Sequence, residues 1–176
     1  MKGCRIPSCC GFVDGRLFKI RQPTDGEDEA YNGWKRMHAT NYQAVALSYC
    51  MIADFDDPYA GLVGDANIWR RLNMQQRLGA IVRDLGEVVT LHGDGAYPFT
   101  DLSRPSFRGD ICADQETFEA DMSKFKQAVE WIFGKLEQLW RFVGDKTRKT
   151  ILLRQMGMED VVTASLRNFQ TSCAAA

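Results

Sequence analysis

Apolar residues recur at intervals of three and four from Met122 to Val143, and this is the strongest pattern in the sequence. On a helical wheel they fall within about 80° of Val129, which predicts a helix with one apolar face, and Glu130 falls near its edge at about 100°. Such a face must be buried against another layer, so we expect this helix to pack on a sheet. Five side chains should then be largely buried: Phe125, Val129, Ile132, Phe133 and Leu136.

Four other segments are typical of strands. Gly11–Ile20 and Glu87–His92 are short and rich in apolar and β-branched residues. Met37–Ser48 alternates partly and then becomes apolar, as a strand buried on both faces does. Tyr49–Phe55 is a second apolar run, so these two segments are candidates for adjacent strands.

Two further helices complete the expected elements. Apolar spacing from Ile68 to Leu85 is helical, with Asp65 at a possible N-cap and Gly86 as a stop, and a last helix is expected over Glu159–Phe169 or a little beyond. Gln22–Gly33 and Pro98–Gly109 are expected to be loops. The order of elements predicts an α/β fold: a mixed sheet flanked by helices, in one domain over residues 1–176.

Composition argues against several classes of protein. Twenty-two basic and 23 acidic residues give a net charge of -1, so there is no overall basic field of a nucleic-acid-binding protein. No apolar run approaches the roughly 18 residues of a membrane span, and the first 13 residues lack the apolar core of a secretory signal. The six cysteines are therefore expected as reduced thiols, and with two histidines they lack the paired spacing of a zinc site.

Charge is nevertheless segregated along the chain. The stretch from Asp84 to Glu119 holds eight acids and two bases, whereas Arg141–Arg154 holds five bases and one acid. An acidic pocket beside a basic rim would suit a metal site that acts on a phosphate chain. The alternative is that both stretches are solvated surface.

Three acids stand at the edges of expected elements. Asp14 lies inside the first strand, Asp94 directly follows the Glu87–His92 strand, and Glu130 flanks the apolar face of the long helix. Acids within apolar elements are costly unless they are paired or bind a cation, and carboxylates are preferred ligands of Mg²⁺. Two such ions about 4 Å apart can activate water for phosphodiester cleavage. The alternative is that each acid is a turn or cap residue.

Several motifs resemble the DDE endonuclease domain of PIF/Harbinger-type transposases and their domesticated relatives. In chain order they are GFVDG (Gly11–Gly15), YNGWKRMHATNYQAV (Tyr31–Val45), GLVGDANIW (Gly61–Trp69), HGDGAYP (His92–Pro98), FEADMSKFKQAVEWIFG (Phe118–Gly134) and, more weakly, ASLRNFQTSC (Ala164–Cys173). The ordered set covers nearly the whole chain and is more specific than any one motif.

The resemblance implies an RNase H-like fold, with a mixed five-stranded sheet and helices on both faces. Asp14 matches the family's first aspartate, Asp94 its second and Glu130 its glutamate, with 35 residues between the last two. Asp65 matches a further acid typical of the group, as a candidate metal ligand or a helix cap. The implied cofactor is Mg²⁺ or Mn²⁺.

The sequence also departs from the family pattern. Residues usual in the family are replaced at Arg16, Trp34, Gly64, Glu119 and Lys126. The helix-turn-helix region that recognises transposon ends in such proteins is absent from this sequence, so we expect a truncated, decaying or domesticated copy.

Two hypotheses follow from the resemblance. The first is a metal-dependent DNA endonuclease whose phosphate contacts come from Lys35, Arg36, Lys126, Arg141, Lys146, Arg148 and Lys149. The second is an inactive remnant that serves as a DNA- or protein-binding module. In either case DNA is the expected partner, with target recognition supplied by a separate DNA-binding protein. The expected location is the nucleus, or otherwise a soluble intracellular state.

Overall fold

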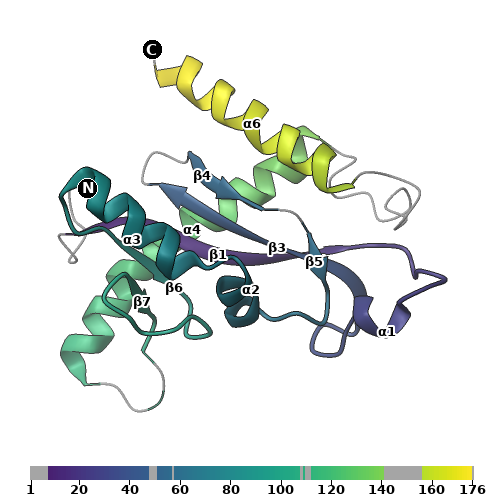
Figure 1. The fold of residues 1–176 in the computed structure, drawn as a ribbon, viewed down its shortest axis with the longest axis horizontal. Helices are drawn as coiled ribbons and strands as arrows, with labels where there is room; N and C mark the ends of the chain where they lie inside the picture. Colours follow the sequence, from purple (N-terminus) through teal and green to yellow (C-terminus); the bar gives the residue numbers. More distant parts are fainter. Residues whose placement is uncertain are drawn as a thin grey trace.

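A mixed β-sheet lies at the centre of the computed structural model, which describes residues 8–47, 51–56, 58–107, 109, 112–140 and 156–175 (Figure 1). Its strands are β1 (Cys9–Lys19), β2 (Tyr31–Asn32), β3 (Met37–Leu47), β4 (Ile52–Phe55), β5 (Tyr59–Ala60), β6 (Thr90–Gly93) and β7 (Ser103–Pro105). The main strand order is β2-β3-β1-β6-β7, and β4 and β5 also pair with β3. β1 is antiparallel to β3 and parallel to β6, while β6 and β7 are parallel.

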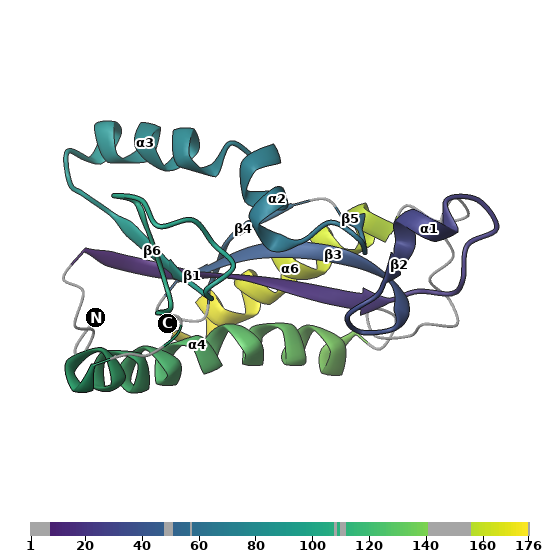
Figure 2. The ribbon, with the colours of Figure 1, turned by 90° about the horizontal axis from the view of Figure 1, so that it is seen from below.

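Helices cover both faces of this sheet. They are α1 (Glu27–Ala30), α2 (Asp65–Arg71), α3 (Met74–Leu85), α4 (Ala113–Leu139) and α6 (Met156–Ala175). Figure 2 shows α2 and α3 on one face and α4 and α6 on the other. We call these the α2 face and the α4 face.

Alternation along β1 divides its side chains between two cores. Phe12 and Phe18 point to the α4 face, where they join the larger core, and Val13 points to the α2 face. The larger core also holds Tyr42, Ile132, Phe133 and Leu136, and the smaller one holds Val45, Trp69, Met74, Leu78, Leu91 and Tyr97. Each helix layer therefore buries its own apolar stripe against the sheet.

The mixed α/β class predicted from the sequence is confirmed. The expected burial of Ile132, Phe133 and Leu136 is also confirmed, whereas the side chains of Phe125 and Val129 lie outside the described ones. β1, β3, β4 and β6 lie within or close to the segments expected as strands. α6 begins and ends beyond the expected Glu159–Phe169.

Some expected boundaries were wrong. α4 begins at Ala113 rather than Met122, because the Gln115 side chain accepts a hydrogen bond from the Cys112 backbone N–H and caps a polar first part of the helix. The helix expected up to Leu85 is broken at Asn73, whose φ of 50° is left-handed. Both expected loops contain short elements: α1 and β2 in the first, β7 in the second.

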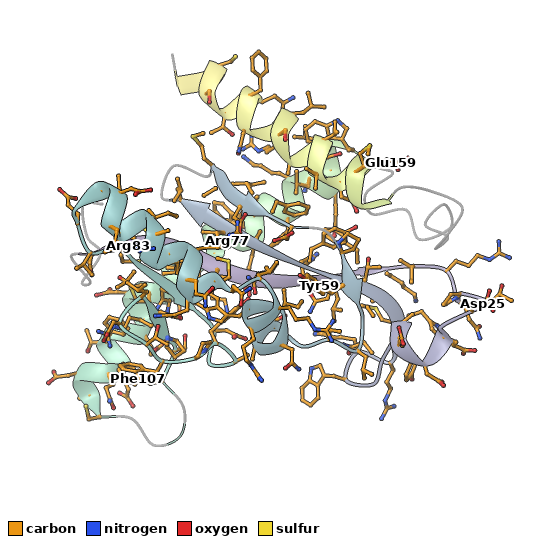
Figure 3. The ribbon with its side chains drawn as sticks, in the orientation of Figure 1. Asp25, Tyr59, Arg77, Arg83, Phe107 and Glu159 are labelled. Carbon is orange, nitrogen blue, oxygen red and sulfur yellow. The ribbon has the colours of Figure 1, made fainter. Side chains whose placement is uncertain are left out.

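Side chains also tie the helix layers to the sheet. Arg77 on α3 pairs with Asp54 of β4 at 2.7 Å and with Asp56 at 3.5 Å (Figure 3). At the other end, the Phe107 ring packs edge-on against Phe118 of α4, with centroids 5.8 Å apart. The first contact joins α3 to β4, and the second joins the segment after β7 to α4. None of the described helices is long and apolar enough to cross a membrane.

Candidate active site

Asp14 lies in the middle of β1 with its side chain toward the α4 face. Alternation with Phe12 sets this direction, and Ala44 is the small residue opposite it on β3. The side chain is only 17% exposed, and the Lys126 Nζ of α4 lies 4.0 Å from its Oδ1. The family-typical acid of the first strand is therefore a largely buried carboxyl with one ammonium group beside it.

Asp94 directly follows β6, the parallel neighbour of β1. Because Phe12 is in register with His92, Asp14 and Asp94 both lie two residues further along their strands, at adjacent positions of the sheet. The Asp94 Oδ1 accepts a hydrogen bond of 2.8 Å from the Ala96 N–H, so this carboxylate also holds the turn that follows. Two carboxylates thus occupy neighbouring positions where β6 ends beside the middle of β1.

The electrostatics of Asp14 reflect this environment. Its pKa is raised from 3.8 to about 6, mainly because burial disfavours the charged form. Lys126 lowers that pKa, whereas Asp94 and then Asp65 raise it. Repulsion by the other two carboxylates therefore raises the pKa of Asp14 less than desolvation does.

Glu130 is exposed on α4, and among the described residues it does not form a three-acid metal-binding group with the two aspartates. Lys126, one helical turn earlier, reaches Asp14, and Glu137, two turns later, pairs with Arg16 at 3.2 Å. These two contacts bracket Glu130, because residues four and seven apart share a helix face. The glutamate is thus on the helix face that runs along β1, with its side chain in solvent.

Asp65 approaches β1 from the other side of the sheet. Gly15 faces away from Asp14, and a Cβ built on it would lie 2.2 Å from the Asp65 Oδ1. Asp65 is the first residue of α2, its neighbour Gly64 is the N-cap, and no side chain caps this helix. The expected helix cap was therefore wrong. The carboxylate instead accepts a hydrogen bond of 2.9 Å from the Asn41 Nδ2.

Asp14 and Asp94 fit a divalent cation by the chemistry of their donors. Both offer hard oxygen ligands, and Asp14 already has a positive group beside it. No three His, Cys, Asp or Glu side chains within the described part of the chain are grouped to hold a metal ion. Mg²⁺ is commonly bound by one or two carboxylates, with water and substrate phosphates completing its shell, so two converging aspartates suffice.

The expected DNA contacts are distributed unevenly. Lys35 and Arg36 lie in the turn between β2 and β3 beside Trp34, which is 88% exposed. Asn32 holds this turn by accepting a hydrogen bond of 2.9 Å from the Lys35 N–H. Lys126 lies beside the Asp14 carboxylate. The other expected contacts lie outside the described residues: Arg141, Lys146, Arg148 and Lys149.

Tyr97 and Asn41 are site neighbours that reasoning from the sequence did not single out. Tyr97 belongs to the HGDGAYP motif, and its buried ring packs edge-on to Trp69 at a centroid distance of 5.7 Å. Asn41 lies in an apolar strand, where a buried amide needs a polar partner. Asn41 could have been found as a polar residue within an otherwise apolar strand, whereas Tyr97 lies in the turn after β6 and only its motif marked it.

The described part of the chain offers little support for nucleophilic catalysis by a side chain. His92 Nε2 lies 3.5 Å from the Ser106 hydroxyl, but His92 is buried and its Nδ1 has no hydrogen-bond partner among the described residues. The pair thus lacks the orienting acid of a Ser-His-Asp arrangement. Among the described cysteines, Cys9, Cys10, Cys112 and Cys173 form no disulfide.

Comparison with known families gives one match. The sequence model described as DDE superfamily endonuclease matches residues 13–167, a range that contains Asp14, Asp65, Asp94 and Glu130. Among curated proteins and among solved structures, none matches the chain at a significant level. The matched range begins within β1, ends within α6 and includes every strand and helix named above between them.

Proposed function

Because the chain belongs to the DDE superfamily endonucleases, we propose that it is a metal-dependent nuclease that hydrolyses DNA phosphodiester bonds at Asp14, Asp94 and Glu130. One observation carries the proposal: Asp14 and Asp94 occupy adjacent positions on parallel strands, and the charge of Asp94 raises the pKa of the buried Asp14. A bound cation would favour the ionised form of both carboxylates.

The three acids would act as ligands rather than as nucleophiles. A bound Mg²⁺ or Mn²⁺ would supply Lewis-acid stabilisation of the negative charge that develops at the phosphodiester. Asp14 and Asp94 would contribute two negative charges from a rigid sheet, and Glu130 would add a third from the exposed helix face. Lys126 would move from Asp14 toward a phosphate oxygen of the DNA strand.

DNA would approach from the side of the sheet where the carboxylates lie. Lys35 and Arg36 would contact the backbone at one end, and the basic stretch from Arg141 to Lys149 would add further phosphate contacts. Such contacts hold DNA without reading its sequence. Target recognition would then come from a separate DNA-binding protein, and the nucleus is the expected location.

A plasmid-nicking assay with Mn²⁺ tests the proposal. Supercoiled plasmid should be nicked by the parent chain and left intact by Glu130→Gln, which keeps shape and loses charge. Glu116→Gln is the matched control, because Glu116 is also exposed on α4 but lies far along the helix from Lys126. Equal nicking by the parent and Glu130→Gln would exclude Glu130 from the site, and absence of nicking by the parent would contradict the proposal.

A second candidate function is an inactive protein-binding module. It is favoured by the exposure of Glu130 and by an apolar stripe on α6, where side chains at helical spacing are exposed: Met158, Val162, Leu166 and Phe169. Such a stripe is typical of a surface that binds another protein. A parent chain that does not nick DNA and yet captures a partner only when this stripe is intact would favour the module.

A further inference from the structure

A group of polar side chains, all but one of them buried, lies on the α2 face, across β1 from Asp14. We call it the Asp65 cluster, and its members are Asp65, Asn41, Gln43 and Tyr97. Asn41, Gln43 and Tyr97 are 4%, 2% and 3% exposed. Gln43 is in register with Gly15, the glycine over which the Asp65 carboxylate lies, and Asn41 is two residues away on the same face of β3. Asn41, Gln43 and Asp65 therefore lie around Gly15 on one face of the sheet, the face on which Tyr97 also packs.

Hydrogen bonding within the cluster is incomplete. Asn41 uses its Nδ2 group twice, toward the Val63 carbonyl at 3.0 Å and toward the Asp65 Oδ1 at 2.9 Å, but its Oδ1 has no partner in the described structure. Neither polar atom of Gln43 is paired there, nor is the Tyr97 hydroxyl. Buried polar groups are rarely left unpaired, and such a set points to a bound ion or water.

Tyr97 cannot turn its hydroxyl away from the cluster. Its ring packs against Trp69, and a Cβ on Gly93 would lie 2.5 Å from the Tyr97 Cδ2, so the strand backbone is in close contact with the ring. Burial raises the pKa of Tyr97, and Asp65 is the charge that raises it most. The ring is therefore held in place on the α2 face, and Asp65 is the carboxylate that acts most strongly on its hydroxyl.

The negative charge of Asp65 indicates which ligand these groups would bind. Asp65 is partly buried, burial and the charge of Asp94 both raise its pKa, and none of the ion pairs within the described ranges involves it. A buried carboxylate without a counter-charge is costly, whereas water would leave its charge uncompensated. We propose that the Asp65 cluster binds a monovalent alkali cation through the Asp65 carboxylate, the Asn41 Oδ1, the Gln43 Oε1 and the Tyr97 hydroxyl oxygen. One positive charge balances the single carboxylate.

This site is separate from the carboxylates of the proposed nuclease and does not depend on their activity. The backbone of β1 lies between Asp14 and Asp65, so a cation at the Asp65 cluster faces α2 rather than α4. Its positive charge would offset the influence of Asp65 on Asp14 through the sheet. The occupied cluster would therefore be neutral and would remove the repulsion that Asp65 exerts on Asp14 across β1.

Thermal melting of the full chain in three salts of equal ionic strength tests the inference. Potassium and sodium chloride supply the alkali cation, and choline chloride supplies a cation too large for the cluster. At ten times the dissociation constant, the parent should melt about 3–6 °C higher in at least one alkali salt than in choline chloride. Equal ionic strength removes the effect of general screening.

Three variants test whether the alkali-dependent rise in melting temperature comes from the Asp65 cluster. Asp65→Asn should show no alkali-dependent rise and should melt above the parent in choline chloride, because a buried unpaired charge is gone. Tyr97→Phe should lose most of the rise while keeping the ring packing. Tyr42→Phe is the matched control, since its hydroxyl donates to Asp160 on the α4 face, and it should keep the full rise.

Each result of these melting experiments either supports or overturns the alkali-cation site. A parent that melts equally in all three salts would overturn the inference, and so would an alkali-dependent rise that persists in Asp65→Asn. An alkali-dependent rise that survives in Asp94→Asn supports a separate site. If the parent shows that rise but neither binds Mn²⁺ nor nicks DNA, the inference holds while the proposed nuclease fails.

Discussion

Replacing Asp14 by asparagine should stabilise the metal-free protein at neutral pH. The pKa of Asp14 is raised from 3.8 to about 6, so the native state binds a proton more tightly than the unfolded state between these values. Stability of the parent should therefore fall as pH rises from about 4 to about 6. Over that window the loss amounts to about 3 kcal/mol, and asparagine, which does not titrate there, avoids it.

Urea unfolding of the parent and Asp14→Asn from pH 4 to pH 7, with a chelator present, measures this difference. The free energies of unfolding should nearly coincide at pH 4, and by pH 7 the variant should be more stable by up to about 3 kcal/mol. Asp101→Asn is the control, because Asp101 is exposed, and it should follow the parent throughout. A constant difference between parent and Asp14→Asn across the pH range, or a variant less stable at pH 7, would refute the reasoning.

Two further predictions concern packing. Phe133→Ala should lower the free energy of unfolding, measured by urea titration, by about 3–5 kcal/mol, since this ring is buried between α4 and the sheet. Trp131→Ala, on the exposed side of α4, should change that free energy by less than about 0.5 kcal/mol. Gly15→Ala should lower the melting temperature because the new Cβ would press on the Asp65 carboxylate, while Gly79→Ala, within α3 and with open space around it, should raise it slightly; a stabilising Gly15→Ala would show that the carboxylate does not lie on β1.

The central strands and the long helix could be predicted because their signals are local. β1 and β3 contain apolar residues that pack on both faces of the sheet. The apolar periodicity of α4 is visible in the sequence because one face of its second half is buried. The elements that could not be predicted from the sequence were short or polar. β7 has three residues and is held by pairing with β6, which no local pattern reveals. The first part of α4 is polar and is set by a cap.

The candidate site could be predicted only in part. The family-like motifs named Asp14 and Asp94, and their adjacency follows from the parallel pairing of β1 with β6, which is a long-range feature. The face on which Asp65 lies could not be inferred, because it depends on the missing side chain of Gly15. Lys126 was expected to contact DNA, and its position 4.0 Å from Asp14 depends on how α4 packs along β1.

Direct binding of Mn²⁺ tests the central claim, that Asp14 and Asp94 form a divalent-cation site. Free Mn²⁺ gives a paramagnetic resonance signal that disappears on binding, so the signal can be titrated against the parent, Asp94→Asn and the Asp101→Asn control. We expect the parent and Asp101→Asn to remove Mn²⁺ from solution with the same affinity, and Asp94→Asn to bind it at least tenfold more weakly, since the loss of one ligand charge costs about 1.4 kcal/mol or more. Equal binding by the parent and Asp94→Asn, or no binding by the parent, would contradict the account.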